Sequence, residues 1–161
     1  MNITLNDRTE EMVRIYYKQS QQPIIKSMLP QKAQSEEEAI SDYHKTLLPS
    51  ASSYGRTIYA DGKYIGDIWC YCIDRSESPN AMISFCIFDQ TYWSQGIATK
   101  AIALFLPEVI QRYEIDSVGA FVYSENYPSI RVLENNGFLF VEEFTEDGRK
   151  SKYYQLTGCN S

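Results

Sequence analysis

The segment Trp93–Thr99 combines small and hydroxyl residues between a strand-like run and a helix-like run. Free backbone N–H groups at a helix N-terminus, together with the positive end of the helix dipole, bind phosphate without basic side chains. Gly96 and Ala98 would let the backbone approach an anion closely, and Ser94 and Thr99 could add hydroxyl donors. The spacing G-x-x-x-x-G-K is absent, so nucleotide hydrolysis is not indicated. The segment predicts a phosphate-binding turn, although an ordinary tight turn explains the same residues.

A second polar segment, residues 124–129, lies where another strand is expected to end and a helix to begin. Ligands of open α/β sheets bind outside the carboxyl ends of the strands, so both segments are expected at one edge of the sheet. Asn126 offers a donor and an acceptor, which suits the amide groups of a pantetheine arm. The same side chain could simply cap the helix that begins at Pro128.

Hydrophobic periodicity predicts the elements that must position these two segments. The patterns predict strands at 3–5, 56–60, 63–73, 81–88, 117–123, 138–144 and 151–156, and helices at 9–19, 36–47, 99–111 and 128–136. A loop with Pro23 and Pro30 is expected between the first two helices. The crossover through helix 99–111 predicts that the strands before and after it are parallel neighbours. The expected fold class is α/β (α+β), a mixed sheet with helices on both faces.

Local signals set the expected turns and helix ends. The Asp-Gly pair at 61–62 suits a type I′ hairpin turn, and the Asn-Gly pair at 136–137 suits a left-handed helix end. Ser35 and Glu38 form a capping box, in which each side chain satisfies a backbone N–H at the helix start. Pro107 removes one hydrogen bond and is expected to kink or shorten its helix.

Composition narrows the classes of partner. The 161 residues are expected to form a single domain, 1–161, with 21 acidic and 15 basic residues and a net charge of −6. A negative field without a basic cluster predicts no nucleic-acid and no membrane partner, and mildly favours a cationic acceptor. The N-terminus lacks a signal-peptide stretch, so a cytoplasmic location is expected. His44 is the only histidine and Cys70-x-Cys72 has the wrong spacing for zinc, so no metal site is expected.

Together the two polar segments resemble the GNAT superfamily of N-acetyltransferases. The coenzyme A pyrophosphate loop of that family has the pattern Arg/Gln-x-x-Gly-x-Gly/Ala, which residues 93–98 match except that Trp93 replaces Arg/Gln. The later run Asn126-x-x-Ser129-x-Arg-Val-Leu-Glu-x-x-Gly-Phe resembles in particular the RimJ/RimL-like branch of ribosomal-protein N-terminal acetyltransferases. The resemblance covers nearly the whole chain. It implies a GNAT-like fold, mostly antiparallel, with a parallel pair of strands at the coenzyme site.

The resemblance also implies an acetyl-CoA site and names its residues. Main-chain groups of a splayed strand would contact the pantetheine and the thioester, the turn would hold the pyrophosphate, and two polar residues would contact the arm and the thiolate. The implied coenzyme-binding residues are Cys86, Ile87, Phe88, Ser94, Gln95, Gly96, Ile97, Ala98, Thr99, Asn126 and Ser129.

The mechanism expected for the family is direct attack of a deprotonated amine on the thioester, with positioning and oxyanion stabilisation by the enzyme. The sequence departs from the commoner pattern at both proton-transfer positions. Leu133 stands where many members have a tyrosine acid, and Phe121 stands where some have a glutamate base. Ser129, or a water held by Asn126, is the candidate acid for the thiolate. An ordinary hydrogen bond at the helix N-terminus would explain Ser129 equally.

Two carboxylates stay open as the catalytic base. Asp67 lies on a central hairpin strand beside Gly66 and could face the acceptor amine, or could be an ordinary edge carboxylate. Glu125 follows a strand end, where solvated turn residues are common. His44 and Asp42 share a charged helix, and a solvated helix face explains this pair better than a catalytic dyad.

The acceptor amine is left open by the sequence. Protein N-termini, amino acids, polyamines and aminoglycoside-type drugs are all compatible with it, and exposed sheet edges make a homodimer reasonable. The loss of a proton donor at Leu133 supports an alternative, a non-catalytic acyl-CoA-binding sensor or regulatory module.

Overall fold

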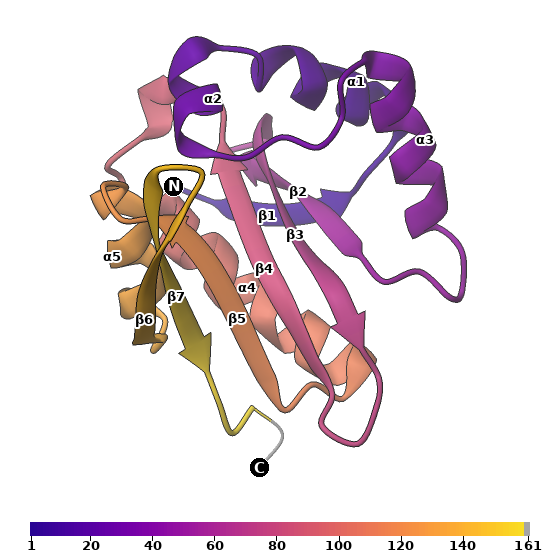
Figure 1. Cartoon of the computed structure of the whole chain (residues 1–161). Coiled ribbons are helices and arrows are strands. Elements are labelled where there is room, and N and C mark those ends of the chain that lie inside the picture. Colours follow the sequence, from indigo (N-terminus) through magenta and orange to yellow (C-terminus); the bar gives the residue numbers. More distant parts are fainter. Residues whose placement is uncertain (160–161) are drawn as a thin grey trace.

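A computed structural model describes residues 1–159 of the chain as a seven-stranded sheet with helices on both faces (Figure 1). The elements in chain order are β1 (Ile3–Asp7), α1 (Glu10–Gln19), α2 (Pro23–Met28), α3 (Glu36–Thr46), β2 (Tyr54–Ala60), β3 (Lys63–Asp74), β4 (Asn80–Ile87), a 3-10 turn η1 (Gln90–Tyr92), α4 (Ile97–Tyr113), β5 (Ser117–Tyr123), α5 (Tyr127–Asn135), β6 (Leu139–Glu146) and β7 (Arg149–Leu156).

The sheet has the order β1-β2-β3-β4-β5-β7-β6, and its neighbours are antiparallel except at one place. The strands β4 and β5 are parallel and pair only over Asn80–Met82 and Ser117–Gly119. Beyond these three pairs the two strands diverge, which leaves the later part of β4 without a partner on that side. The mixed sheet with a single parallel pair confirms the predicted fold class.

Two hydrophobic clusters fix the helices on opposite faces of the sheet. The larger cluster packs α4 and α5 on one face, with Ile102, Phe105 and Leu133 almost fully buried. A smaller cluster on the other face holds α1 and α2 through Ile25 and Phe88. Burying such side chains is the main source of stability. No helix among residues 1–159 is long and apolar enough to cross a membrane.

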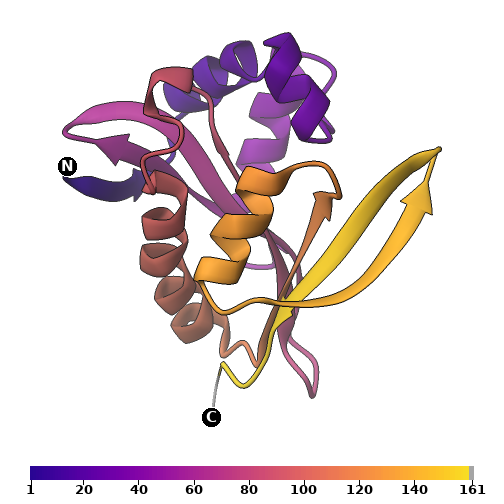
Figure 2. The same cartoon turned by 90° about the vertical axis from the view of Figure 1, so that its left-hand side faces the viewer.

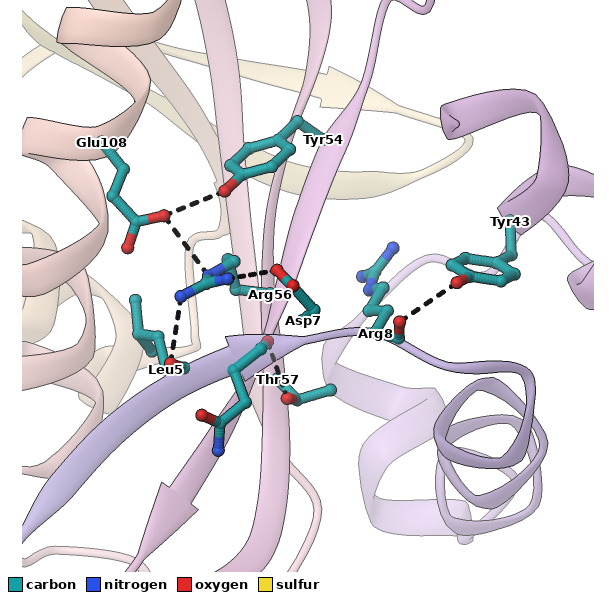
Figure 3. Close-up of polar contacts among 9 residues, drawn as sticks. Leu5, Asp7, Arg8, Tyr43, Tyr54, Arg56, Thr57 and Glu108 are labelled. Carbon is teal, nitrogen blue, oxygen red and sulfur yellow. Dashed lines mark hydrogen bonds and ion pairs between the residues drawn. The ribbon is translucent and has the colours of Figure 1, made fainter. Parts of the chain in front are cut away.

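Polar contacts tie the first edge of the sheet to α4 (Figure 3). The guanidinium of Arg56 pairs with Asp7, donates to the carbonyl of Leu5 at 3.1 Å, and lies 3.3 Å from the Glu108 carboxylate. The Tyr54 hydroxyl donates to Glu108 at 2.9 Å. Burial, reinforced by this bond, raises the pKa of Tyr54 to about 12, so the phenol stays a donor at neutral pH.

The local signals in the sequence place most turns correctly. Asp61 and Gly62 both have positive φ, 48° and 83°, as a type I′ turn requires. Gly137 ends α5 with φ 85°. The Ser35 hydroxyl accepts from the Glu38 N–H at 3.1 Å, while the Glu38 carboxylate accepts from the N–H of the residue before Ser35.

One expectation about helices was wrong, and a second was wrong as to helix length. The segment after Pro23 forms α2 instead of a loop, because Pro23 suits the first helical position and Ile25 is buried against the sheet. The helix α4 is not shortened at Pro107 and runs on to Tyr113. Ala103, whose carbonyl loses its donor, and Pro107 are both exposed, so water can satisfy that carbonyl.

Candidate active site

A cleft of about 700 Å³ lies where β4 and β5 diverge. Its walls are Ile83–Phe85 of β4 and Ala120–Tyr123 of β5, with Asn126 and Ser129 at the start of α5 and Leu133 in its last turn. The β6–β7 hairpin, which extends away from α4 and α5 in Figure 2, forms a further side. The structure therefore brings the second polar segment of the sequence to the gap in the sheet.

The turn before α4 presents unused backbone donors. Gly96 is the N-cap of α4 with φ 75°, and no side chain caps this helix. The N–H groups of Gly96, Ile97, Ala98 and Thr99 donate no hydrogen bond to any group of residues 1–159. A Cβ added at Gly96 would meet no atom of residues 1–159 within 4 Å, so the space beside Gly96 is open. Four successive free amides at a helix N-terminus are suited to an anion.

Contacts on the preceding residues hold this turn in place. The Trp93 indole N–H donates to the carbonyl of Ile87, the last residue of β4, at 2.8 Å. Asp89 accepts from the Thr91 hydroxyl and pairs with Lys63 at 3.0 Å. Trp93, which departs from the Arg/Gln of the resemblance, thus links the turn to the end of the strand.

Only one of the three predicted strand residues, Ile87, turns its main-chain groups toward the opening. The Phe88 N–H donates to Ile65 at 2.9 Å and the Phe88 carbonyl accepts from Gln22, so both groups are used. Cys86 lies opposite Asp67 in the antiparallel register, and alternation directs its main-chain groups toward β3. The same alternation directs the N–H of Ile87 toward the open side.

Asn126 and Ser129 lie together at the start of α5. The Asn126 side chain is 7% exposed, and its oxygen accepts from the Ser129 N–H at 3.3 Å as a helix cap. The amide NH₂ of Asn126 and the hydroxyl of Ser129 donate to no group of the described chain, and both residues line the cleft. Asn126 therefore caps the helix and keeps a donor for a ligand.

The comparisons with known proteins decide the family. A model of the family "Acetyltransferase (GNAT) domain" matches residues 3–139. This chain belongs to the GNAT acetyltransferase family. The match confirms the predicted family and enzyme class, an acetyl-CoA-dependent N-acetyltransferase. No curated protein gives a significant sequence match.

Solved acetyltransferases share the GNAT fold with this chain at low sequence identity. Spermidine N-acetyltransferase from Vibrio cholerae, in complex with CoA and spermine, has a TM-score of 0.85 at 16% identity, over 98% of this chain and 96% of that one. RimL, the ribosomal L7/L12 alpha-N-protein acetyltransferase, in complex with coenzyme A, has a TM-score of 0.83 at 16% identity over 100% and 97%. The aminoglycoside acetyltransferase AAC(6')-Ib in complex with coenzyme A has a TM-score of 0.80 at 17% identity over 97% and 95%.

The carboxylate of Asp67 in this GNAT domain lies away from the cleft lining. Asp67 is 2% exposed, 3.2 Å from the Arg8 guanidinium, and accepts from the Tyr64 hydroxyl at 2.5 Å. Burial raises the pKa of Asp67, and the nearby Arg8 charge opposes that rise. Asp67 is thus an interior carboxylate, neither at an edge nor beside the cleft.

The other titratable candidates each contact a polar partner of their own. Glu125 pairs with Arg149 of β7 at 2.8 Å. His44 contacts Glu10 of α1 at 2.5 Å, and its neighbour Asp42 lies 4.0 Å from Lys32. His44 and Asp42 therefore form no dyad, and His44 connects α3 to α1.

Sequence reasoning missed the part of the site that the β6–β7 hairpin supplies. Phe144, Glu142, Glu146 and Ser151 line the cleft from this hairpin. The alternation of polar and apolar residues in β6 and β7 predicts strands, but not which face of the hairpin meets the cleft. The widening between β4 and β5, which exposes Ile83–Phe85 to the cleft, carries no sequence signal either.

Proposed function

We propose that this GNAT domain binds acetyl-CoA across the β4–β5 opening and passes the acetyl group to a primary amine that enters beside the β6–β7 hairpin. The observation that carries the proposal is the set of four free amides from Gly96 to Thr99, in the turn that follows the unpaired end of β4. In this arrangement the diphosphate accepts from these amides, with hydroxyl help from Ser94 and Thr99 and with Gln95 at the rim. The positive end of the α4 dipole adds to the attraction.

The pantetheine arm would follow the open side of β4. Its amides would pair with free main-chain groups there, and its carbonyls with the Asn126 NH₂. The walls of Ile83 and Val122 would exclude water from the arm. The free cysteines support a reducing compartment, and we propose the cytoplasm as the location.

In the proposed reaction the neutral amine attacks the thioester carbonyl carbon, and the C–S bond then breaks. The amine loses one proton and the coenzyme A sulfur gains one. The Ile87 N–H faces the opening and would donate to the oxyanion. Ser129 is the hydroxyl that we propose to protonate the sulfur, because Leu133 cannot. Asp67, in the interior, is not among the residues that we propose for proton transfer.

We also propose a homodimer and, as a second candidate function, a sensor. A homodimer would use one of the two edge strands, β1 or β6, and β6 carries the exposed side chains Leu139, Phe140 and Val141. A non-catalytic acyl-CoA sensor is the second candidate function, favoured by the absence of an acidic hydroxyl at Leu133.

The experiment that separates enzyme from sensor is a thiol-release assay with acetyl-CoA and a panel of amines, paired with thermal unfolding in the same buffer. Acetyl-CoA is expected to raise Tm, because at 100 times Kd it adds about 2.7 kcal/mol to the free energy of unfolding. Thiol release that depends on an amine supports the enzyme. A rise in Tm without turnover of any amine would support the sensor, and no rise would contradict both.

A further inference from the structure

The hairpin side of the cleft has an aromatic floor. Phe121 of β5 lies between Tyr153 of β7 and Phe144 of β6, with ring centroids 5.1 and 5.6 Å apart. Phe121 is 54% exposed although it is a large apolar side chain in a strand. The apolar residues Met28, Leu29 and Pro30, at the end of α2 and just after it, line the same cleft. The cleft therefore offers an apolar channel to whatever enters from this side.

Carboxylates border this channel. Glu142 and Glu146 of β6 and Asp147 in the following turn line the cleft, and none of them pairs with a cation of residues 1–159. Three residues of strand lie between Glu142 and Glu146, so their Cα atoms are about 13 Å apart. Unpaired carboxylates in a partly enclosed cleft create a local negative potential.

Arg149 is the cationic side chain among the described residues that line the cleft, and it already has an anionic partner. The Arg149 guanidinium pairs with Glu125 at 2.8 Å, donates to the Ser27 carbonyl of α2 at 2.6 Å, and stacks 3.5 Å from the Tyr123 ring centroid. These contacts fasten the hairpin to α2 and leave the three carboxylates without a counter-charge.

A buried polar side chain also points to a ligand here. Ser151 of β7 is 8% exposed and lines the cleft, and its hydroxyl makes no hydrogen bond to a group of residues 1–159. The Ser151 hydroxyl is therefore free to donate to, or accept from, a ligand in the cleft. Ser151 lies opposite Phe144 in the hairpin register, between the aromatic floor and the Glu146 end.

We propose that the acceptor is an aliphatic amine that carries a second, protonated amine, that is, an alkyl di- or polyamine. This inference rests on the proposed acetyl transfer. The attacking nitrogen must be neutral, whereas a distal ammonium stays charged and is held by Glu142, Glu146 or Asp147. The methylene linker contacts the aromatic floor and the apolar residues opposite. A polyhydroxylated sugar amine would leave many hydroxyls against these apolar surfaces without partners.

The test compares kcat/KM of the full chain for spermidine, 1,4-diaminobutane and n-butylamine with saturating acetyl-CoA. Exposed ion pairs contribute up to about 1 kcal/mol each, so the di- and polyamine are expected to exceed n-butylamine on the order of tenfold. Kanamycin and a short peptide with a free N-terminus serve as further acceptors. Both are expected to react more slowly than spermidine.

The double variant Glu142→Gln/Glu146→Gln should bring the spermidine to n-butylamine ratio toward one. Glu143→Gln, on the same strand, is the matched control. Its carboxylate accepts from the Ser124 hydroxyl at 2.9 Å instead of lining the cleft, and glutamine keeps that acceptor. The control should leave the ratio unchanged.

Equal kcat/KM values for n-butylamine and spermidine would overturn the inference and leave acetyl transfer standing. Faster reaction of kanamycin or of the peptide would overturn it in the same way. Failure of the proposed function is a different result, namely no turnover of any amine by a protein that binds acetyl-CoA.

Discussion

The two sides proposed for the coenzyme and for the acceptor are built from different parts of the chain. The proposed coenzyme side consists of main-chain groups at the N-terminus of α4 and along β4, whereas the proposed acceptor side consists of side chains of the β6–β7 hairpin. The family match covers residues 3–139, which contain the first side and end where the hairpin begins. Binding of the diphosphate by backbone N–H groups requires little more than a small residue in the turn before α4. Binding of an acceptor by hairpin side chains can change through substitutions that leave the fold intact.

The largest expected effect tests the backbone side. Gly96→Glu places a carboxylate in front of the four free amides, so it should weaken acetyl-CoA binding by at least about 100-fold, the loss of two charge-assisted hydrogen bonds. Isothermal titration calorimetry measures this change. Gly96→Ala is the control, because it carries the same strain of positive φ without the charge. Wild-type affinity in Gly96→Glu would place the diphosphate elsewhere.

The next effect concerns proton transfer on the coenzyme side. Ser129→Ala should lower kcat by roughly 100-fold with little change in the Kd of acetyl-CoA, because it removes a proton donor rather than a binding group. Ser129→Thr should retain most of the activity. If kcat of Ser129→Ala stays within a factor of two of wild type, the serine only supports the start of the helix.

A smaller effect tests whether Asp67 is a structural ion-pair partner or the catalytic base. Asp67→Asn leaves the mostly buried Arg8 without its counter-charge. The free energy of unfolding, measured by urea titration, should therefore fall by about 2 kcal/mol. Asp7→Asn, at the exposed carboxylate beside Arg56, should cost far less. A 100-fold loss of kcat in Asp67→Asn with unchanged stability would make Asp67 the base.

The smallest effect is a pH dependence at the turn before α4. Hydrogen bonding from the Thr91 hydroxyl, and then from Lys63, lowers the pKa of Asp89 below its ordinary value of 3.8. The stabilisation is therefore present above pH 3.8 and is lost as the pH falls through the lowered pKa. Asp89→Asn should lower the free energy of unfolding by a few tenths to about 1 kcal/mol at pH 7. Near pH 2 the variant and the wild type should be equally stable. A difference that persists in acid would mean that the carboxylate charge is not its cause.

The sequence predicted the parts of the structure that local chemistry determines. The turn at Gly96, the hairpin turn at 61–62 and the helix end at Gly137 need positive φ, and glycine at these places is visible without any tertiary knowledge. The strand–helix–strand crossover likewise predicted the parallel pair β4–β5. A backbone conformation that only a few residue types adopt can therefore be predicted from the sequence.

The rest depended on partners far apart in the chain. Asp67 could be seen as interior only once Arg8 and Tyr64 were placed beside it, and α2 formed because Ile25 found a surface to cover. The extent of the β4–β5 opening depends on where pairing stops, which no residue type marks. The hairpin residues that line the cleft were missed for the same reason, because their strand alternates regularly and only the packing of the hairpin shows which face meets the cleft.

The most direct test of the account is a ¹H–¹⁵N NMR titration of the labelled chain with coenzyme A. The amide signals of Gly96, Ile97, Ala98 and Thr99 are expected to move downfield together as the diphosphate accepts from them, while that of Gly137 at the far end of α5 is expected to stay in place. Saturable binding that leaves these four signals unmoved would contradict the account.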